Sequence, residues 1–305
     1  MTTAAVFASP VDTEVFGAYQ ARHPSPRDGV ERPFYPFQDR IGAPGSSPYP
    51  AEPGRYHLYV SYGCPWAQIV SVVRAAKDLE EVVTASYVDE ERDGRGWAFR
   101  ERFGPDPVNG FALLRDAYEL TEPGYDGHIS VPTLWDRATT RVVSNDFPVI
   151  PVDLATRFDA WGDASVDLYP EHLRGEIDAY DSRITAEVKA GGLVDGVNAL
   201  DAHEAQLAES AFVHGETLTL SDIRLWVKLI RFEVGYHAAI ERDGRGLPDY
   251  PNLWAYTRRL YERPEFAGTT RPEVLRAQRD RILGEKPPGA VHEAAVRRDE
   301  EWAEG

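Results

Sequence analysis

The alternation of apolar and polar residues changes along the chain, and the first change comes near residue 55. Residues 1–54 are interrupted so often by proline that long helices and central strands are excluded, because proline lacks the N–H that both require. The segment is also rich in aromatic residues, which is atypical of disorder: Phe34, Tyr35, Phe37 and Tyr49. We therefore expect an N-terminal arm that is at least partly ordered and lies over a surface.

A strand, a turn and a helix are predicted next. Tyr56–Val60 is a short β-rich run, residues 61–63 form a turn, and the apolar run from Pro65 predicts a helix that reaches Glu80. A second β-branched run at 82–88 predicts another strand.

Residues 89–127 are polar, contain Gly and Pro, and join no obvious strand, so we interpret them as an insertion. Two short strands follow at 129–135 and 141–143, separated by a connection of hairpin length. A β-α-β unit followed by a hairpin is the layout of a thioredoxin-like domain, which we assign to residues 55–152.

From residue 153 the pattern becomes helical. Apolar residues recur at three- and four-residue spacing in two stripes: Leu173, Ile177, Tyr180 and Ile184, then Ile223, Val227, Ile230 and Val234. Thr219 and Asp222 have capping-box spacing, and another helix is expected at 252–262 between two prolines. The sequence thus predicts an all-helical domain at 153–283 and a frayed tail at 284–305.

Composition excludes several classes of protein. Fifty acidic against 33 basic residues give a formal charge of −17, which repels nucleic acid and anionic membranes. The longest stretch without Asp, Glu, Lys, Arg or His, residues 58–73, contains Gly63 and Pro65 and is shorter than the ~20 apolar residues of a spanning helix. The N-terminus lacks the pattern of a secretory signal, and a single cysteine fits a reducing compartment. We expect a cytoplasmic protein.

Cys64 is the strongest candidate for chemistry. It lies where a predicted strand turns into a helix, and Pro65 occupies the first helical position. A helix N-terminus favours a thiolate and can lower a cysteine pKa from ~8.5 into the range ~3.5–7.5. Position 67 is alanine, so two-cysteine redox chemistry is excluded and any disulfide must form with an external thiol. The competing interpretation is a small buried apolar residue.

Val131-Pro132 precedes a predicted strand. It is interpreted either as an ordinary edge proline or as a cis peptide that turns backbone groups toward Cys64, where a peptide-like thiol could pair with them. The eight histidines form no i, i+4 pair, so no metal site is expected. The sequence Arg-Asp-Gly-Arg-Gly occurs at 92–96 and 242–246, and both copies are interpreted as polar turns.

The chain resembles the Xi class of glutathione transferases, the glutathionyl-hydroquinone reductases. The resemblance covers roughly residues 30–285 and rests on blocks that occur in order: Arg55–Val60, Cys64–Ala67, Gly96–Phe99, Val131–Asp136, Val143–Asn145, Asp167–Pro170, Asp222–Leu225, Leu229–Phe232 and Asp249–Leu253. It implies a thioredoxin-like domain that holds a thiol, followed by an all-helical glutathione-transferase domain over an aromatic substrate site, and a homodimer.

The resemblance also implies roles for single residues. Cys64 would attack the sulfur of a thiol-conjugated hydroquinone or quinone, or of a mixed disulfide, and form an enzyme–thiol mixed disulfide that a second thiol resolves. Tyr236 matches a family tyrosine that hydrogen-bonds the thiolate. The positions that match the thiol-binding residues of the family are Trp97, Val131, Pro132, Thr133, Asn145 and Asp146.

The chain departs from the family at several positions. Asp146-Phe147 replaces the Glu-Ser pair that holds the γ-glutamyl end of glutathione, which leaves glutathione and mycothiol as alternative thiols. The family's tyrosine proton donor is missing from 189–195, so Tyr180, Tyr236 or Tyr250 would have to supply the proton unless the leaving group needs none. A non-catalytic binding or assembly protein with the same fold is the alternative from another class.

Overall fold

The computed structural model describes residues 5–43, 45, 47–191, 200–236 and 246–283. The chain forms two compact units, Met1–Val166 and Asp167–Gly305. The domain boundaries expected from the sequence stay predictions, and the tail at 284–305, the second Arg-Asp-Gly-Arg-Gly copy at 242–245 and the end of the segment at 189–195 lie outside the described residues.

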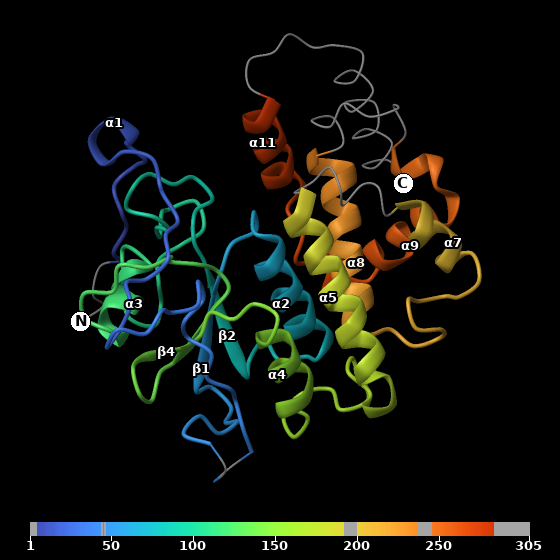
Figure 1. Cartoon of the computed structure of the whole chain (residues 1–305), viewed down its shortest axis with the longest axis horizontal. Coiled ribbons are helices and arrows are strands. Elements are labelled where there is room, and N and C mark those ends of the chain that lie inside the picture. Colours follow the sequence, from blue (N-terminus) through green and yellow to red (C-terminus); the bar gives the residue numbers. More distant parts are fainter. Residues whose placement is uncertain (1–4, 44, 46, 192–199, 237–245, 284–305) are drawn as a thin grey trace. The chain divides into compact units, whose positions relative to one another are not determined.

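The first unit is built on a four-stranded sheet with the order β2-β1-β3-β4. Strand β1 is parallel to β2 and antiparallel to β3, and β3 is antiparallel to β4. Helices α2 and α4 pack together on one side of the sheet, and α3 contacts β4 on the other (Figure 1). The elements are α1 (Thr13–Phe16), β1 (Tyr56–Val60), α2 (Pro65–Ala76), β2 (Val83–Tyr87), α3 (Arg115–Thr121), β3 (Thr133–Asp136), β4 (Arg141–Ser144) and α4 (Ile150–Arg157).

This arrangement confirms the thioredoxin-like fold, and two details correct the expectation. Helix α2 ends at Ala76 rather than Glu80, since Asp78 has a φ of 53° that a continuing helix does not allow. The segment expected to be an insertion contains α3, whose buried face comprises Ala117, Tyr118 and Thr121. Its length of seven residues is too short to give a clear helical pattern in the sequence.

The described part of the N-terminal arm lies along the edge of the sheet. Its residues around Gln38 lie antiparallel to β4: the Asp39 N–H donates to the Val143 carbonyl at 3.2 Å, and the Asn145 N–H donates to the Phe37 carbonyl at 2.9 Å. Arg40 then forms an ion pair with the buried Asp153 of α4 at 2.6 Å. The arm therefore covers the edge strand and fixes its own path across the first unit.

The second unit is helical, as expected. Its elements are η1 (Glu171–Leu173), α5 (Arg174–Gly191), α7 (Leu200–Leu207), α8 (Leu220–Arg231), the π-helix η2 (Phe232–Tyr236), η4 (Leu247–Asp249), α9 (Pro251–Tyr261), α10 (Pro264–Ala267) and α11 (Pro272–Leu283). The predicted capping box is present, because the Thr219 N–H donates to the Asp222 carboxylate at 2.8 Å. The stripe Ile223, Val227, Ile230 and Val234 is buried.

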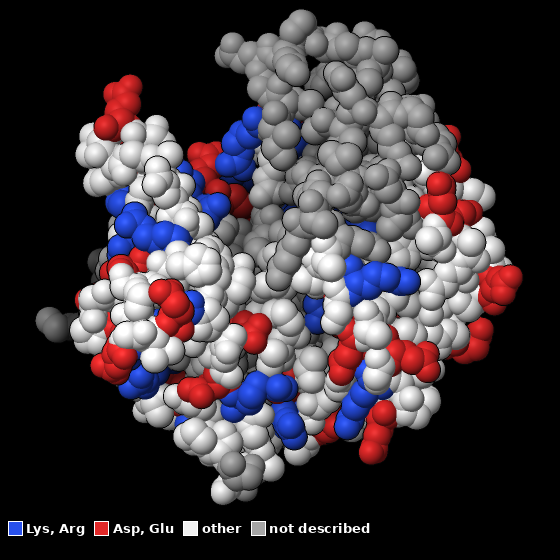
Figure 2. Space-filling view, in the orientation of Figure 1, with Lys and Arg blue, Asp and Glu red and all other residues white. Residues whose placement is uncertain are grey.

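On the face drawn in Figure 2, basic side chains are scattered among acidic ones over the residues that the structure describes. None of the helices in the described ranges is long and apolar enough to cross a bilayer. Within the same ranges no three His, Cys, Asp or Glu side chains gather in a group that could hold a metal ion.

Candidate functional site

Cys64 lies at the N-cap of α2, one turn after β1 ends. Its extended backbone (φ −92°, ψ 120°) and Pro65 at the first helical position direct the chain from strand to helix. The Cys64 N–H donates to the Ser61 carbonyl at 3.2 Å, and the thiol is half-buried and not part of a disulfide. The sequence therefore folds locally so that a reachable sulfur stands over the free N–H groups of a helix.

A buried carboxyl group supports the turn before Cys64. The Ser61 hydroxyl donates to Glu90 Oε1 at 3.4 Å, while Glu90 Oε2 is buried without a hydrogen-bond partner among the described residues. Burial raises the pKa of Glu90 above its ordinary value. Sequence reasoning missed this residue, since nothing in the polar run after β2 singles it out.

The Val131-Pro132 peptide bond is cis, and the carbonyl of Val131 faces the cysteine. Cys64 Sγ lies 3.3 Å from Val131 O, so the thiol can donate to this carbonyl. The Val131 N–H has no hydrogen-bond partner in the described part of the chain. The geometry thus agrees with the interpretation of Val131-Pro132 as a cis peptide beside Cys64. The Val131 N–H stays available as a backbone donor in this region.

Trp97 follows the first Arg-Asp-Gly-Arg-Gly turn and is 8% exposed. The guanidinium of Arg92 stacks on its ring at 4.1 Å. Its Nε1–H is buried without a hydrogen-bond partner among the described residues, which is costly unless a ligand accepts it. This orphaned donor makes Trp97 a better binding candidate than its buried ring alone would suggest.

The side chains of Thr133 and Asn145 form hydrogen bonds with other groups of the protein. Thr133 is fully buried, and its hydroxyl donates to the Ser130 carbonyl at 2.6 Å. Asn145 Oδ1 accepts the Phe37 N–H at 3.2 Å, and Asn145 Nδ2 donates to the Ser130 hydroxyl at 3.2 Å. Both side chains therefore hold the loop before Pro132 and the N-terminal arm in place.

Asp146 and Phe147 follow β4 and lead into α4. The Asp146 carbonyl accepts the Val149 N–H at 3.0 Å, and its side chain is half-buried. Phe147 is 5% exposed and packs on Trp66 of α2, with ring centroids 4.3 Å apart. An aromatic contact thus occupies the position that the sequence resemblance pairs with a serine of the family.

Three further rings lie in this region, those of Phe34, Tyr35 and His128. Sequence reasoning missed all three as site residues. The Tyr35 ring lies edge-on to Phe147 at 5.4 Å, and Phe34 stacks on His128 at 4.8 Å. Burial, then the charge of Arg92, lowers the pKa of His128 to about 4, so this ring is neutral at neutral pH. The aromatic content of the arm was the available signal for these contacts.

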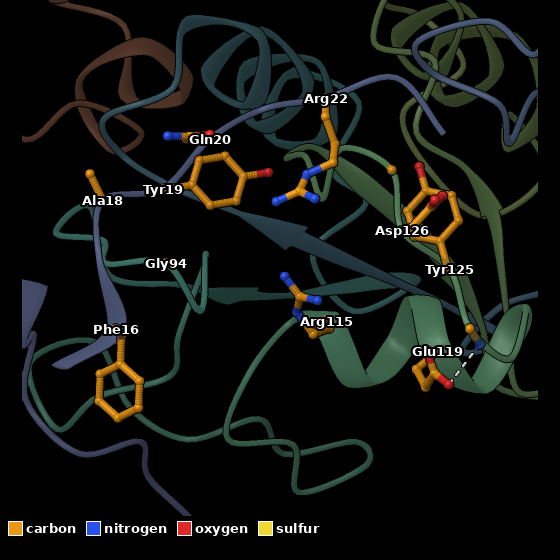
Figure 3. A pocket seen from close by; sticks show the side chains of 12 residues that line it. Phe16, Ala18, Tyr19, Gln20, Arg22, Gly94, Arg115, Glu119, Tyr125 and Asp126 are labelled. Carbon is orange, nitrogen blue, oxygen red and sulfur yellow. Dashed lines mark hydrogen bonds between the residues drawn. The ribbon is translucent and has the colours of Figure 1, made fainter. Parts of the chain in front are cut away.

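A separate cavity of about 340 Å³ lies between the arm, α3 and the segment 124–127, and Cys64 does not line it. The guanidinium groups of Arg22 and Arg115 face each other across it (Figure 3). Tyr19 also lines the cavity, and its hydroxyl bonds to His128 Nδ1 at 2.8 Å. Tyr19 thereby links the cavity wall to the aromatic residues near the cysteine.

Comparison with known proteins identifies the family. Residues 186–259 match the glutathione S-transferase C-terminal domain. The glutathionyl-hydroquinone reductase PcpF of Sphingobium chlorophenolicum is 34% identical over 72% of this chain and 75% of its own length. The chain belongs to the Xi-class glutathione transferase family.

Two further comparisons agree with this membership of the Xi class. The glutathionyl-hydroquinone reductase YqjG of Escherichia coli is 33% identical over 77% of both chains. The glutathione-bound structure of YqjG has a TM-score of 0.75 and 29% identity over 84% of this chain and 94% of that one. This member of the Xi class is accordingly a thiol-dependent reductase of the glutathione transferase type, with a small-molecule thiol as its partner.

Tyr236 is the last residue of η2 in the second unit, and its side chain lies outside the described residues. Its hydrogen bond to the thiolate, like the homodimer and the cytoplasmic location, stays a prediction.

Proposed function

We propose that the protein reduces a thiol-conjugated, quinone-type aromatic compound, with Cys64 as the nucleophile. One observation carries the proposal: the Cys64 sulfur, at the start of α2, lies 3.3 Å from the carbonyl that precedes cis-Pro132. The names of PcpF and YqjG as glutathionyl-hydroquinone reductases support the substrate class. Family membership also favours an enzyme over the non-catalytic alternative.

The proposed binding of the thiol uses two N–H donors, those of Val131 and the Trp97 ring, that have no hydrogen-bond partner among the described residues. The Val131 N–H pairs with the peptide backbone of the thiol, and Trp97 Nε1–H donates to an acceptor on it. Asp146 faces the end of the thiol remote from sulfur, while Pro132, Thr133 and Asn145 hold these groups in position. The test is release of free hydroquinone from a glutathionyl-hydroquinone conjugate, together with mass spectrometry of a thiol adduct on Cys64.

Glutathione is the first candidate for the thiol, since the solved YqjG structure is described as glutathione-bound. Mycothiol is a second candidate because one observation favours it. Phe147 lacks the hydroxyl of the family's serine and is packed on Trp66, so the γ-glutamyl group loses a hydrogen-bond partner. Mycothiol has no γ-glutamyl group and loses nothing at this position.

Immobilised glutathione is expected to retain the protein weakly. Restoring the family pair with the double variant Asp146→Glu, Phe147→Ser should strengthen retention about tenfold, as two recovered hydrogen bonds of ~0.5–1.5 kcal/mol each allow. Elution by free glutathione measures the difference, with Asp146→Glu alone as the control. Tight retention of the unaltered protein would contradict the argument for mycothiol.

A further inference from the structure

The N-terminal arm brings a phenol to the thiol site from a distant part of the sequence. Two contacts fix the arm on either side of Tyr35. Arg32 forms a bidentate ion pair with Glu122, at 2.7 and 2.9 Å. The Phe37 N–H donates to Asn145 Oδ1 at 3.2 Å. Tyr35 therefore has a defined position rather than that of a residue on a loose terminal segment.

The Tyr35 ring belongs to an aromatic row that reaches the first turn of α2. It lies edge-on to Phe147 at 5.4 Å, and Phe147 packs on Trp66 at 4.3 Å. Trp66 follows Pro65 directly, and Pro65 follows Cys64. This row exists only because position 147 is aromatic, which is the same position at which the chain departs from its family.

The Tyr35 hydroxyl is uncommitted, and it lies within electrostatic reach of the cysteine. The side chain is half-buried and makes no hydrogen bond to any described residue. Burial raises the pKa of Tyr35 first, and the charges of Cys64 and Asp146 raise it further. The phenol consequently stays protonated at neutral pH and keeps its proton to donate.

Three other tyrosines of the first unit have hydroxyls that already form hydrogen bonds within the protein. The Tyr118 hydroxyl bonds to Thr133 Oγ1 at 2.9 Å, the Tyr125 hydroxyl donates to the His128 carbonyl at 3.1 Å, and Tyr19 bonds to His128. Among these four phenols, Tyr35 is the one that can form a new hydrogen bond without breaking an old one.

We propose that Tyr35 donates the proton that the aromatic leaving group takes up when Cys64 removes the sulfur from it. This inference rests on the function proposed above. It supplies a donor where the family tyrosine expected at 189–195 is missing, and it makes the arm a part of the catalytic site.

The step balances in atoms and electrons. The Cys64 thiolate forms a bond to the sulfur of the conjugate, the carbon–sulfur bond breaks, and its electron pair stays on the aromatic carbon. That carbon takes the Tyr35 proton, so the aromatic product is reduced while the two sulfurs are oxidised to a mixed disulfide. Water reprotonates Tyr35, and a second thiol molecule releases Cys64 with formation of a free disulfide.

The test compares two substrates that differ in their leaving group. With a glutathionyl-hydroquinone conjugate, Tyr35→Phe should lower kcat about 10²-fold or more, the usual contribution of a general acid. With the mixed disulfide of glutathione and 2-mercaptopyridine, whose leaving thiolate needs no proton, the same variant should turn over at the unaltered rate. Tyr87→Phe, which removes another half-buried hydroxyl of the first unit, is the matched control.

Each outcome separates this inference from the proposed function. Equal losses with both substrates would make Tyr35 a structural residue and overturn the inference, as would no loss with either. If unaltered protein turns over the mixed disulfide but not the hydroquinone conjugate, the proposed substrate class is wrong. In that case Tyr35→Phe would still be expected to leave disulfide turnover unchanged.

Discussion

Replacing Cys64 with serine is expected to abolish thiol-dependent turnover, with a loss of about 10³-fold or more. A serine hydroxyl is a poor nucleophile toward sulfur and cannot form the mixed disulfide that the second thiol must resolve. The substitution preserves the size of the side chain and the N-cap of α2, so the fold should be retained. Steady-state release of hydroquinone from its glutathionyl conjugate measures the effect.

The single cysteine makes the control for this experiment direct. Cys64 is the chain's one thiol, so mass spectrometry after incubation with glutathione disulfide reports on this side chain alone. The unaltered protein should gain one adduct and the Cys64→Ser variant none, while both give the same circular dichroism spectrum. Full activity in the serine variant would remove Cys64 from the mechanism and the proposed function with it.

The largest loss of stability is expected from Asp222→Ala in the second unit. The carboxylate is fully buried and accepts the N–H groups of Val213 and Thr219, each at 2.8 Å, and the hydroxyl of Tyr256 at 3.0 Å. Alanine removes the acceptor of the two N–H groups and of the Thr219 hydroxyl, at a cost of about 1–3 kcal/mol for each buried donor left without a partner, while the Tyr256 hydroxyl keeps the Asp222 carbonyl at 3.2 Å. The free energy of unfolding should fall by about 3 kcal/mol or more.

Urea unfolding of the intact chain, followed by circular dichroism, would measure this loss for Asp222→Ala. Tyr256→Phe is the matched control, because it removes one hydrogen bond from the same carboxylate and should cost about 1 kcal/mol. Equal midpoints for Asp222→Ala and the unaltered protein would show that the cap network does not hold the start of α8.

Features set by neighbouring residues were predictable from the sequence. The strand Tyr56–Val60 was predicted with its observed bounds, and Pro65 marked the start of α2. Thr219 and Asp222 identified the start of α8 because a capping box joins residues three apart. Each of these depends on backbone conformation and hydrogen bonds within a few residues, so a local pattern contains the information.

The composition of the site depended on contacts between distant residues. Tyr35 packs against Phe147, which lies more than a hundred residues later in the sequence. Asn145 hydrogen-bonds the Phe37 N–H of the arm and the Ser130 hydroxyl. No periodicity encodes such pairs, because they form only when the arm adds to the β4 edge. The sequence alone determined the fold class, the cysteine and its helix, whereas the tertiary structure decided which aromatic and polar groups surround that cysteine, since long-range packing places them there.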